Sequence, residues 1–146
     1  DGNYSLYHYK SLVSHLLIGP AGVFAILPYN QGGVIEYNQE RNRWKQKGGN
    51  FFLKSFGGES LGRPDLDAKY ALGDLTKQLA KLGIDTGTYT PQSIIVFTNP
   101  KAEIKSENSP VPAFPQEKLK EFIRKQVKSS SFPQEKLVLI KEKLGE

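Results

Sequence analysis

Carboxylate side chains are the groups in this chain that could hold a metal ion and activate water. Five acids lie within residues 36–67: Glu36, Glu40, Glu59, Asp65 and Asp67. A hydrolytic Mg²⁺ site is built from such groups placed side by side. Glu36 is the best placed, since it follows the apolar residues of a predicted strand, but no second acid has a comparable position. Its alternation with Ile35 and Tyr37 favours a solvated strand residue.

Other reactive groups are scarce. His8 and His15 could act as metal ligands or as a general base, but their strand context without nearby acids favours partly buried histidines. The chain has no Cys, which excludes disulfides, thiol nucleophiles and thiolate metal sites. The glycine pairs at 32–33, 48–49 and 57–58 match neither Gly-x-x-x-x-Gly-Lys-Ser/Thr nor Gly-x-Gly-x-x-Gly, so we interpret them as turns.

A basic segment at residues 41–54 could bind a polyanion. It contains no acid and carries Arg41, Arg43, Lys45, Lys47 and Lys54, with Trp44 among them. In a nucleic-acid interface the cations would contact phosphates while Trp44 stacks on a base. The alternative is a solvated strand edge with Trp44 in the core. The formal net charge of +5 favours polyanions only weakly.

Length and composition predict one soluble globular domain. The chain has 146 residues, of which 38% are hydrophobic and 24% charged. No apolar run approaches the roughly 20 residues that cross a bilayer, so we expect no membrane contact in this segment. The compartment stays open, with the cytoplasm as the default expectation. Because the chain lacks Met even at position 1, we expect part of a parent protein to lie outside it.

The first half of the chain has the periodicity of β-strands. Residues 14–18 and 23–27 are predicted to form a hairpin, because the Gly-Pro-Ala-Gly sequence at 19–22 is typical of a turn. An antiparallel sheet is predicted to contain this hairpin, a first strand at residues 3–10 and continuing strands at 34–37 and around 43–46. Phe51, Phe52 and Leu53 are expected to cover its end.

The second half begins with a helix. Pro64 suits its first turn, Asp65 and Asp67 its positive end and Gly83 its stop, which predicts a helix over 64–82. One apolar stripe packs it on a sheet: Ala68, Leu72, Leu75, Leu79 and Leu82. Residues 93–98 predict a strand buried on both faces. A strand after a helix requires a crossover, so the sheet should be mixed.

A short repeat marks the end of the chain. The sequence Phe-Pro-Gln-Glu-Lys-Leu occurs at 114–119 and again at 132–137. Each copy places Pro and an acid in the first turn of a predicted amphipathic helix. Leu119, Phe122, Ile123 and Val127 form one apolar stripe, and Leu137, Ile140 and Leu144 form another. We favour two helices that pack on the sheet over a two-copy interaction arm.

Five motifs follow one another in a distinctive order. They are HLLIGPAGVFAI at 15–26, GVI at 33–35, Trp44, GRP at 62–64 and IIVFTN at 94–99. This series resembles the nuclease-related (NERD) domains of the restriction-endonuclease superfamily. The resemblance implies an α/β fold with a mixed central sheet flanked by helices. Residues 1–100 would form the core without the family's first helix, and 101–146 would form a helical extension packed on the same domain.

The resemblance also implies where a metal site would lie. In such domains an Asp precedes the His-hydrophobic run and a Glu-x-Lys follows the Gly-Val-Phe run. Here those positions hold Ser14, Leu27 and Tyr29, and Asp67 replaces a Gln that the family often carries in the helix. A hydroxyl, an alkyl chain and a phenol cannot hold a hard cation as carboxylates do. We therefore expect no cofactor, and Mg²⁺ only if carboxylates have relocated.

Three functions remain open after this comparison. The favoured one is a catalytically inactive nuclease-related domain that acts as a structural or protein-interaction module, with a separate protein or other domains of its parent chain as partner. The first alternative is a nucleic-acid-binding domain that uses residues 41–54. The second is a metal-dependent nuclease with relocated carboxylates.

Overall fold

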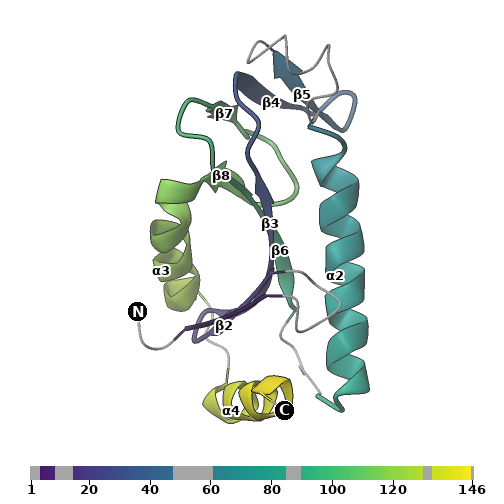
Figure 1. Cartoon of the computed structure of the whole chain (residues 1–146), viewed down its shortest axis with the longest axis vertical. Coiled ribbons are helices and arrows are strands. Elements are labelled where there is room, and N and C mark those ends of the chain that lie inside the picture. The colour runs from purple at the N-terminus through teal and green to yellow at the C-terminus, as the bar shows by residue number, and fades with distance from the viewer. Residues whose placement is uncertain (1–3, 9–14, 48–60, 85–89, 130–132, 146) are drawn as a thin grey trace.

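A computed structural model describes residues 4–8, 15–47, 61–84, 90–129 and 133–145. Figure 1 shows a curved sheet with the long helix α2 on one side and helix α3 on the other, while α4 lies at one end. The described residues thus form a mixed α/β structure, as the sequence predicts. No helix among them is long and apolar enough to cross a membrane.

The main sheet has five strands in the order β1-β2-β3-β6-β8. Strands β1 to β3 are antiparallel neighbours, whereas β6 runs parallel to β3 and β8 runs parallel to β6. The predicted mixed sheet is therefore confirmed. The bounds are Ser5–His8 for β1, His15–Gly19 for β2, Gly22–Tyr29 for β3, Gln92–Phe97 for β6 and Ala113–Pro115 for β8.

The hairpin between β2 and β3 forms where the sequence predicts it. Gly19 pairs with Gly22 around a two-residue turn. Gly22 has a φ of 135°, a conformation that side chains other than glycine rarely adopt. Gly19 is required for another reason, since a Cβ there would lie 2.0 Å from the Tyr4 ring. The Tyr4 hydroxyl in turn accepts a hydrogen bond of 3.3 Å from the Ala21 N–H.

Residues 34–47 do not continue the main sheet, so that part of the prediction is wrong. Strands β4 (Val34–Asn38) and β5 (Arg43–Lys47) instead join β7 (Glu103–Lys105) in a second sheet, in the order β5-β4-β7. Both edges of β3 are already hydrogen-bonded, to β2 and to β6, so β4 has no free edge there. Gly33, with a φ of 84°, lies where the chain enters the second sheet.

Helix α2 (Pro64–Lys81) ends one residue before the predicted limit. Ala68, Leu75 and Leu79 are fully or almost fully buried on its apolar side. Strand β6 confirms the prediction of burial on both faces, because its four residues 94–97 contact different hydrophobic clusters in alternation. The buried Ser93 hydroxyl donates a hydrogen bond of 2.9 Å to the Ala68 carbonyl, which ties β6 to α2.

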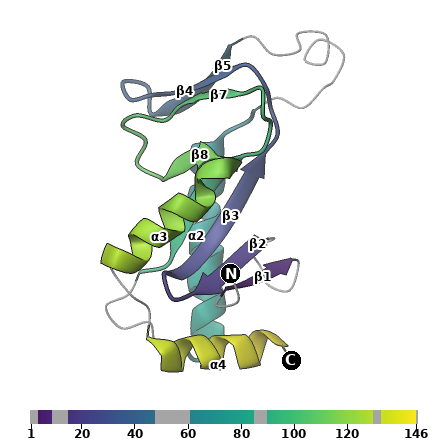
Figure 2. The same cartoon turned by 90° about the vertical axis from the view of Figure 1, so that its left-hand side faces the viewer.

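The two terminal helices pack at different places. Helix α3 (Leu119–Ser129) covers the face of the main sheet opposite α2, where Ile123 is buried beside Phe24 (Figure 2). Helix α4 (Gln134–Gly145) buries Leu137 and Ile140 against residues of β2, β3 and α2. Lys143 also donates a hydrogen bond to the Leu82 carbonyl just after α2.

The two copies of the repeat begin their helical segments at the same relative position, directly after the proline. Helix α4 begins directly after Pro133, as predicted for the second copy. In the first copy Phe114 and Pro115 belong to strand β8, and a 3-10 turn at Gln116–Lys118 begins directly after Pro115 and leads into α3. Phe114 pairs with Val96 of β6, and its ring packs 5.0 Å from that of Phe122. These contacts hold the residue that precedes the first helical segment against the main sheet.

Candidate functional site

The candidate site lies where β3 and β6 end beside the first turn of α2. A pocket of about 680 Å³ opens there. Its lining comprises Pro28, Tyr29, Asn30, Gln31, Leu61, Gly62, Asp67 and Thr98. Parallel strands bring their carboxyl ends to one edge of a sheet, which is a common place for ligand sites in α/β folds. The pocket includes two positions that the NERD resemblance singles out, Tyr29 and Asp67.

Tyr29 and Asp67 are joined by a short hydrogen bond. The Tyr29 hydroxyl donates to Asp67 Oδ2 at 2.6 Å across 38 residues of sequence. Burial raises the pKa of the Tyr29 phenol, and the hydrogen bond to Asp67 and the negative charges of Asp67 and Asp65 raise it further. The phenol therefore keeps its proton at neutral pH, and it serves as a donor to the carboxylate.

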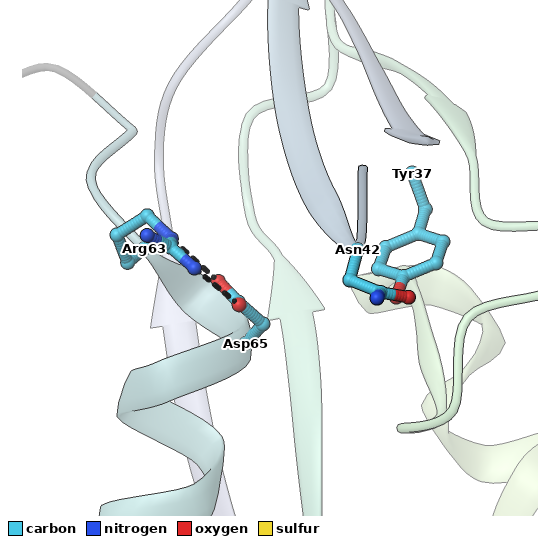
Figure 3. A network of polar contacts seen from close by, with 4 residues as sticks. All are labelled: Tyr37, Asn42, Arg63 and Asp65. Atoms are coloured by element: carbon cyan, nitrogen blue, oxygen red, sulfur yellow. Dashed lines mark hydrogen bonds and ion pairs between the residues drawn. The ribbon is translucent and has the colours of Figure 1, made fainter. Parts of the chain in front are cut away.

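The second acid of this turn is bound by an arginine. Arg63 donates from Nε to Asp65 Oδ1 at 3.1 Å and from Nη2 to Oδ2 at 2.9 Å, a bidentate pair seen in Figure 3. These bonds lower the pKa of the Asp65 carboxyl, although partial burial acts in the opposite direction. Both carboxylates at the start of α2 thus already interact with protein donors.

The four positions to which the NERD resemblance maps the family's site residues have different outcomes. Leu27 and Tyr29 are two residues apart on β3, so they face the same way, and both pack against the hydrophobic cluster that contains Trp44. Asp67 reaches Tyr29 from α2. Ser14 lies outside the described residues. Three of the four positions are therefore placed, and two of them are in contact.

The other acids and the histidines do not add to this pocket. Glu36 is exposed on β4, where its Cα partners are Lys45 on β5 and Lys105 on β7. His15 pairs with His8 in the β1–β2 ladder, in a different part of the main sheet. Within the described part of the chain, acids and histidines form no group of three or more that could hold a metal ion. Glu59 falls outside that part.

The basic segment forms one face of β5 at the edge of the second sheet. Arg43, Lys45 and Lys47 are exposed, and Arg41 is exposed in the preceding turn. Lys54 and the phenylalanines expected to cover the sheet end, Phe51 and Phe52, lie outside the described residues, as does Leu53. The cations that are described face solvent, as a polyanion-binding surface would require.

Trp44 does not belong to that exposed face. Only 6% of its surface is accessible, and its ring lies 5.5 Å from the Tyr37 ring and 5.6 Å from the Phe97 ring. An indole enclosed in this way cannot stack on a nucleic-acid base. Figure 3 shows the neighbouring Tyr37, whose hydroxyl lies 3.5 Å from Asn42 Oδ1 in the β4–β5 turn. Trp44 is a core residue, which corrects its candidate role in base stacking.

Sequence reasoning missed a polar network that joins the ends of β3 and β6. The Thr98 hydroxyl donates to Asn30 Oδ1 at 3.1 Å, and Asn99 Nδ2 donates to the Asn30 carbonyl at 3.2 Å. Asn30 and Thr98 also line the pocket. The signal available in the sequence was a pair of asparagines, Asn30 and Asn99, that follow two apolar strands.

No protein-family model matches the chain, and no similar curated protein or solved structure was found.

Proposed function

We propose that this chain is a nuclease-related domain of the restriction-endonuclease-like type that lacks metal-dependent hydrolysis and acts as a structural or protein-interaction module. The observation that carries the proposal is the hydrogen bond of 2.6 Å from Tyr29 to Asp67. It joins the position of the family's Lys on β3 to the position of the family's Gln on α2.

The chemistry of the side chains supports the loss of hydrolysis. Mg²⁺ requires several oxygen ligands in near-octahedral geometry, of which carboxylates supply the charge. At the position of the family's Glu, the Leu27 side chain has no oxygen that could bind Mg²⁺. The protonated phenol of Tyr29 supplies no negative charge. Among the described residues Asp67 is the one acid that lines the pocket, and its carboxylate already accepts a hydrogen bond from the Tyr29 hydroxyl.

The arrangement of the strands supports the fold assignment. An antiparallel β2–β3 hairpin is followed by α2 and then by β6, which pairs in parallel with β3. This is a mixed sheet flanked by helices, as the resemblance implies. Leu27 and Tyr29 lie at the carboxyl end of β3, beside the pocket that would receive a phosphate group in an active relative.

Rebuilding the site tests this proposal. In the triple variant Ser14→Asp, Leu27→Glu, Tyr29→Lys, we expect Mn²⁺ binding that calorimetry detects and that the wild-type chain lacks. The single variant Tyr29→Lys is the matched control, because it removes the phenol without adding a carboxylate. A folded triple variant that binds no Mn²⁺ would contradict the nuclease-related assignment.

Hydrolysis itself is tested with supercoiled plasmid and either Mg²⁺ or Mn²⁺. We expect no nicking by the wild-type chain. Nicking that Glu36→Ala abolishes would refute the proposal and would identify Glu36 as a relocated ligand.

Nucleic-acid binding is a second candidate function, which the exposed face of β5 favours. Successive cations on this face are about 7 Å apart, since residues two apart on a strand share one side. Glu36 stands opposite Lys45 and reduces the local positive charge. Without an accessible Trp44, binding would rely on phosphate contacts, so it should be strongly dependent on salt and weakly dependent on sequence.

A charge-reversal pair tests this candidate. If β5 binds DNA, Arg43→Glu with Lys45→Glu should lower the affinity about tenfold or more and make its salt dependence shallower. Lys69→Glu with Lys77→Glu is the matched control, because it makes the same charge change on exposed positions of α2. Equal losses in both variants would exclude a specific β5 interface.

A further inference from the structure

A second cavity lies under α3, away from the candidate site. This groove has a volume of about 790 Å³ and runs between α3, the β2–β3 hairpin and the segment before β1. From the hairpin side it is lined by Tyr4, Leu17 and Pro20. Figure 2 shows α3 across this face of the main sheet. The volume of the groove is comparable with that of pockets that hold ligands, about 300–1,000 Å³.

The helical wall of the groove has two rows of side chains. Leu119, Ile123 and Val127 form an apolar row, in which Ile123 is buried and Val127 is 40% exposed. Lys120, Arg124 and Lys128 form a basic row beside it. Each row repeats every four residues, so its members lie on one side of the helix and span about 12 Å.

The basic row forms no ion pair among the described residues. Helix α3 carries four basic residues and a single acid, Glu121, whose carboxylate pairs with Lys125 Nζ at 2.9 Å. No ion pair of Lys120, Arg124 or Lys128 is formed within the described part of the chain. An anionic partner could therefore interact with all three without displacing an existing pair.

We propose that this groove binds an acidic amphipathic helix of a partner protein. Apolar side chains of that helix would enter the groove against Leu17 and Val127, while its acids, spaced three or four residues apart, would pair with Lys120, Arg124 and Lys128. The inference rests on the proposed interaction function and names the class of partner that the function requires.

The shape of the groove favours a peptide over other anionic partners. Phosphates of a nucleic acid would use the basic row but would leave the apolar row exposed to water. A membrane surface is flat on this scale, whereas the apolar row lies within a groove between α3 and the hairpin. A helix about twelve residues long extends about 18 Å and therefore covers the length of about 12 Å of both rows at once.

The test begins with the full chain immobilised and a phage-displayed library of random peptides. We expect the enriched peptides to combine leucine or phenylalanine with acids at spacings of three and four. The affinity of the most enriched peptide, measured by fluorescence anisotropy, should fall about tenfold or more in Arg124→Glu with Lys128→Glu. It should also fall in Val127→Asp, which places a charge in the apolar row at a side chain that is 40% exposed.

Lys69→Glu with Lys77→Glu again provides the matched control and should retain the wild-type affinity. An equal loss of affinity in this control would refute a specific groove. Enriched peptides that bind Arg124→Glu with Lys128→Glu, or Val127→Asp, as tightly as the wild type would also refute it. In the latter case the interaction function would stand and only its location would be wrong. Failure to enrich any peptide would refute both the groove and the interaction function. The plasmid assay tests the loss of hydrolysis separately.

Three further measurements distinguish other occupants. Phosphatidylserine-containing vesicles and duplex DNA are titrated with the same variants, and sedimentation tests for a dimer that Val127→Asp disrupts. A groove-dependent signal in any of these, without peptide binding, would overturn the proposal.

Discussion

At the scale of single residues, the decisive feature is a neutral phenol beside a carboxylate. Burial and the charges of Asp67 and Asp65 both favour the protonated form of Tyr29, so its pKa is raised above the ordinary value of 10.0. A Lys at this position would bring a positive charge, whereas the phenol brings only a hydrogen-bond donor. The hydrogen bond from Tyr29 to Asp67 therefore ties the end of β3 to the first turn of α2.

The raised pKa of Tyr29 predicts a specific loss of stability at alkaline pH. The unfolded chain releases this proton near pH 10, while the folded chain retains it. Its contribution to stability is therefore complete below about pH 10 and declines as the pH rises toward the folded-state pKa. Tyr29→Phe should cost about 1 kcal/mol at neutral pH through the lost hydrogen bond and should make the alkaline decline shallower.

Urea denaturation at a series of pH values between about 8 and about 11 measures this effect. Tyr70→Phe, which removes an exposed phenol from α2, controls for the loss of one tyrosine. An alkaline decline of the same steepness in Tyr29→Phe and in the wild type would contradict the assigned cause.

At the scale of elements, β5 shows how one strand divides its side chains between two environments. Arg43, Lys45 and Lys47 face solvent, while Trp44 between them is enclosed by Tyr37 and Phe97. This alternation follows from the period of two in a strand. The basic segment and the aromatic core are therefore opposite faces of one element, and a mutation on one face should leave the other intact.

Neighbouring substitutions on β5 should consequently differ widely in cost. Trp44→Ala removes a buried aromatic side chain and should lower the free energy of unfolding by about 3–5 kcal/mol. Arg43→Glu with Lys45→Glu should change it by about 0.5 kcal/mol or less per site, since both side chains are exposed. Denaturant titration followed by circular dichroism compares them, and similar costs for the two would contradict this orientation of the strand.

At the scale of the whole molecule, the two sheets share a hydrophobic core. Phe97 of the main sheet contacts Trp44 of the second sheet, and Ala68 of α2 belongs to the same cluster. Helix α2 spans from this cluster to the one that holds Leu79 and α4. Because no part buries its apolar surface alone, the described elements should unfold together.

Coincident transitions are the measurable consequence. Fluorescence of Trp44, the single tryptophan, reports on the second sheet, whereas far-ultraviolet circular dichroism is dominated by the helices. We expect the same midpoint in urea from both probes. Two separated midpoints would show that the second sheet is an independent unit.

Local signals in the sequence were sufficient for several elements. The hairpin turn at 19–22, helix α2 and strand β6 could be predicted because turn chemistry, helix-end residues and apolar period act over neighbouring positions. The mixed sheet followed from the order of strands and helix. Three-residue strands such as β7 and β8 carry too little pattern to be detected in the same way.

Only the tertiary structure decided which distant residues meet. Whether β4 joins the main sheet depends on the free edges of β3, and the strand conformation of Phe114 depends on its pairing with Val96. Sequence mapping singled out Tyr29 and Asp67 separately, but their hydrogen bond spans 38 residues. Contacts of this length arise from how whole elements pack, since no local preference of either residue selects the other as its partner.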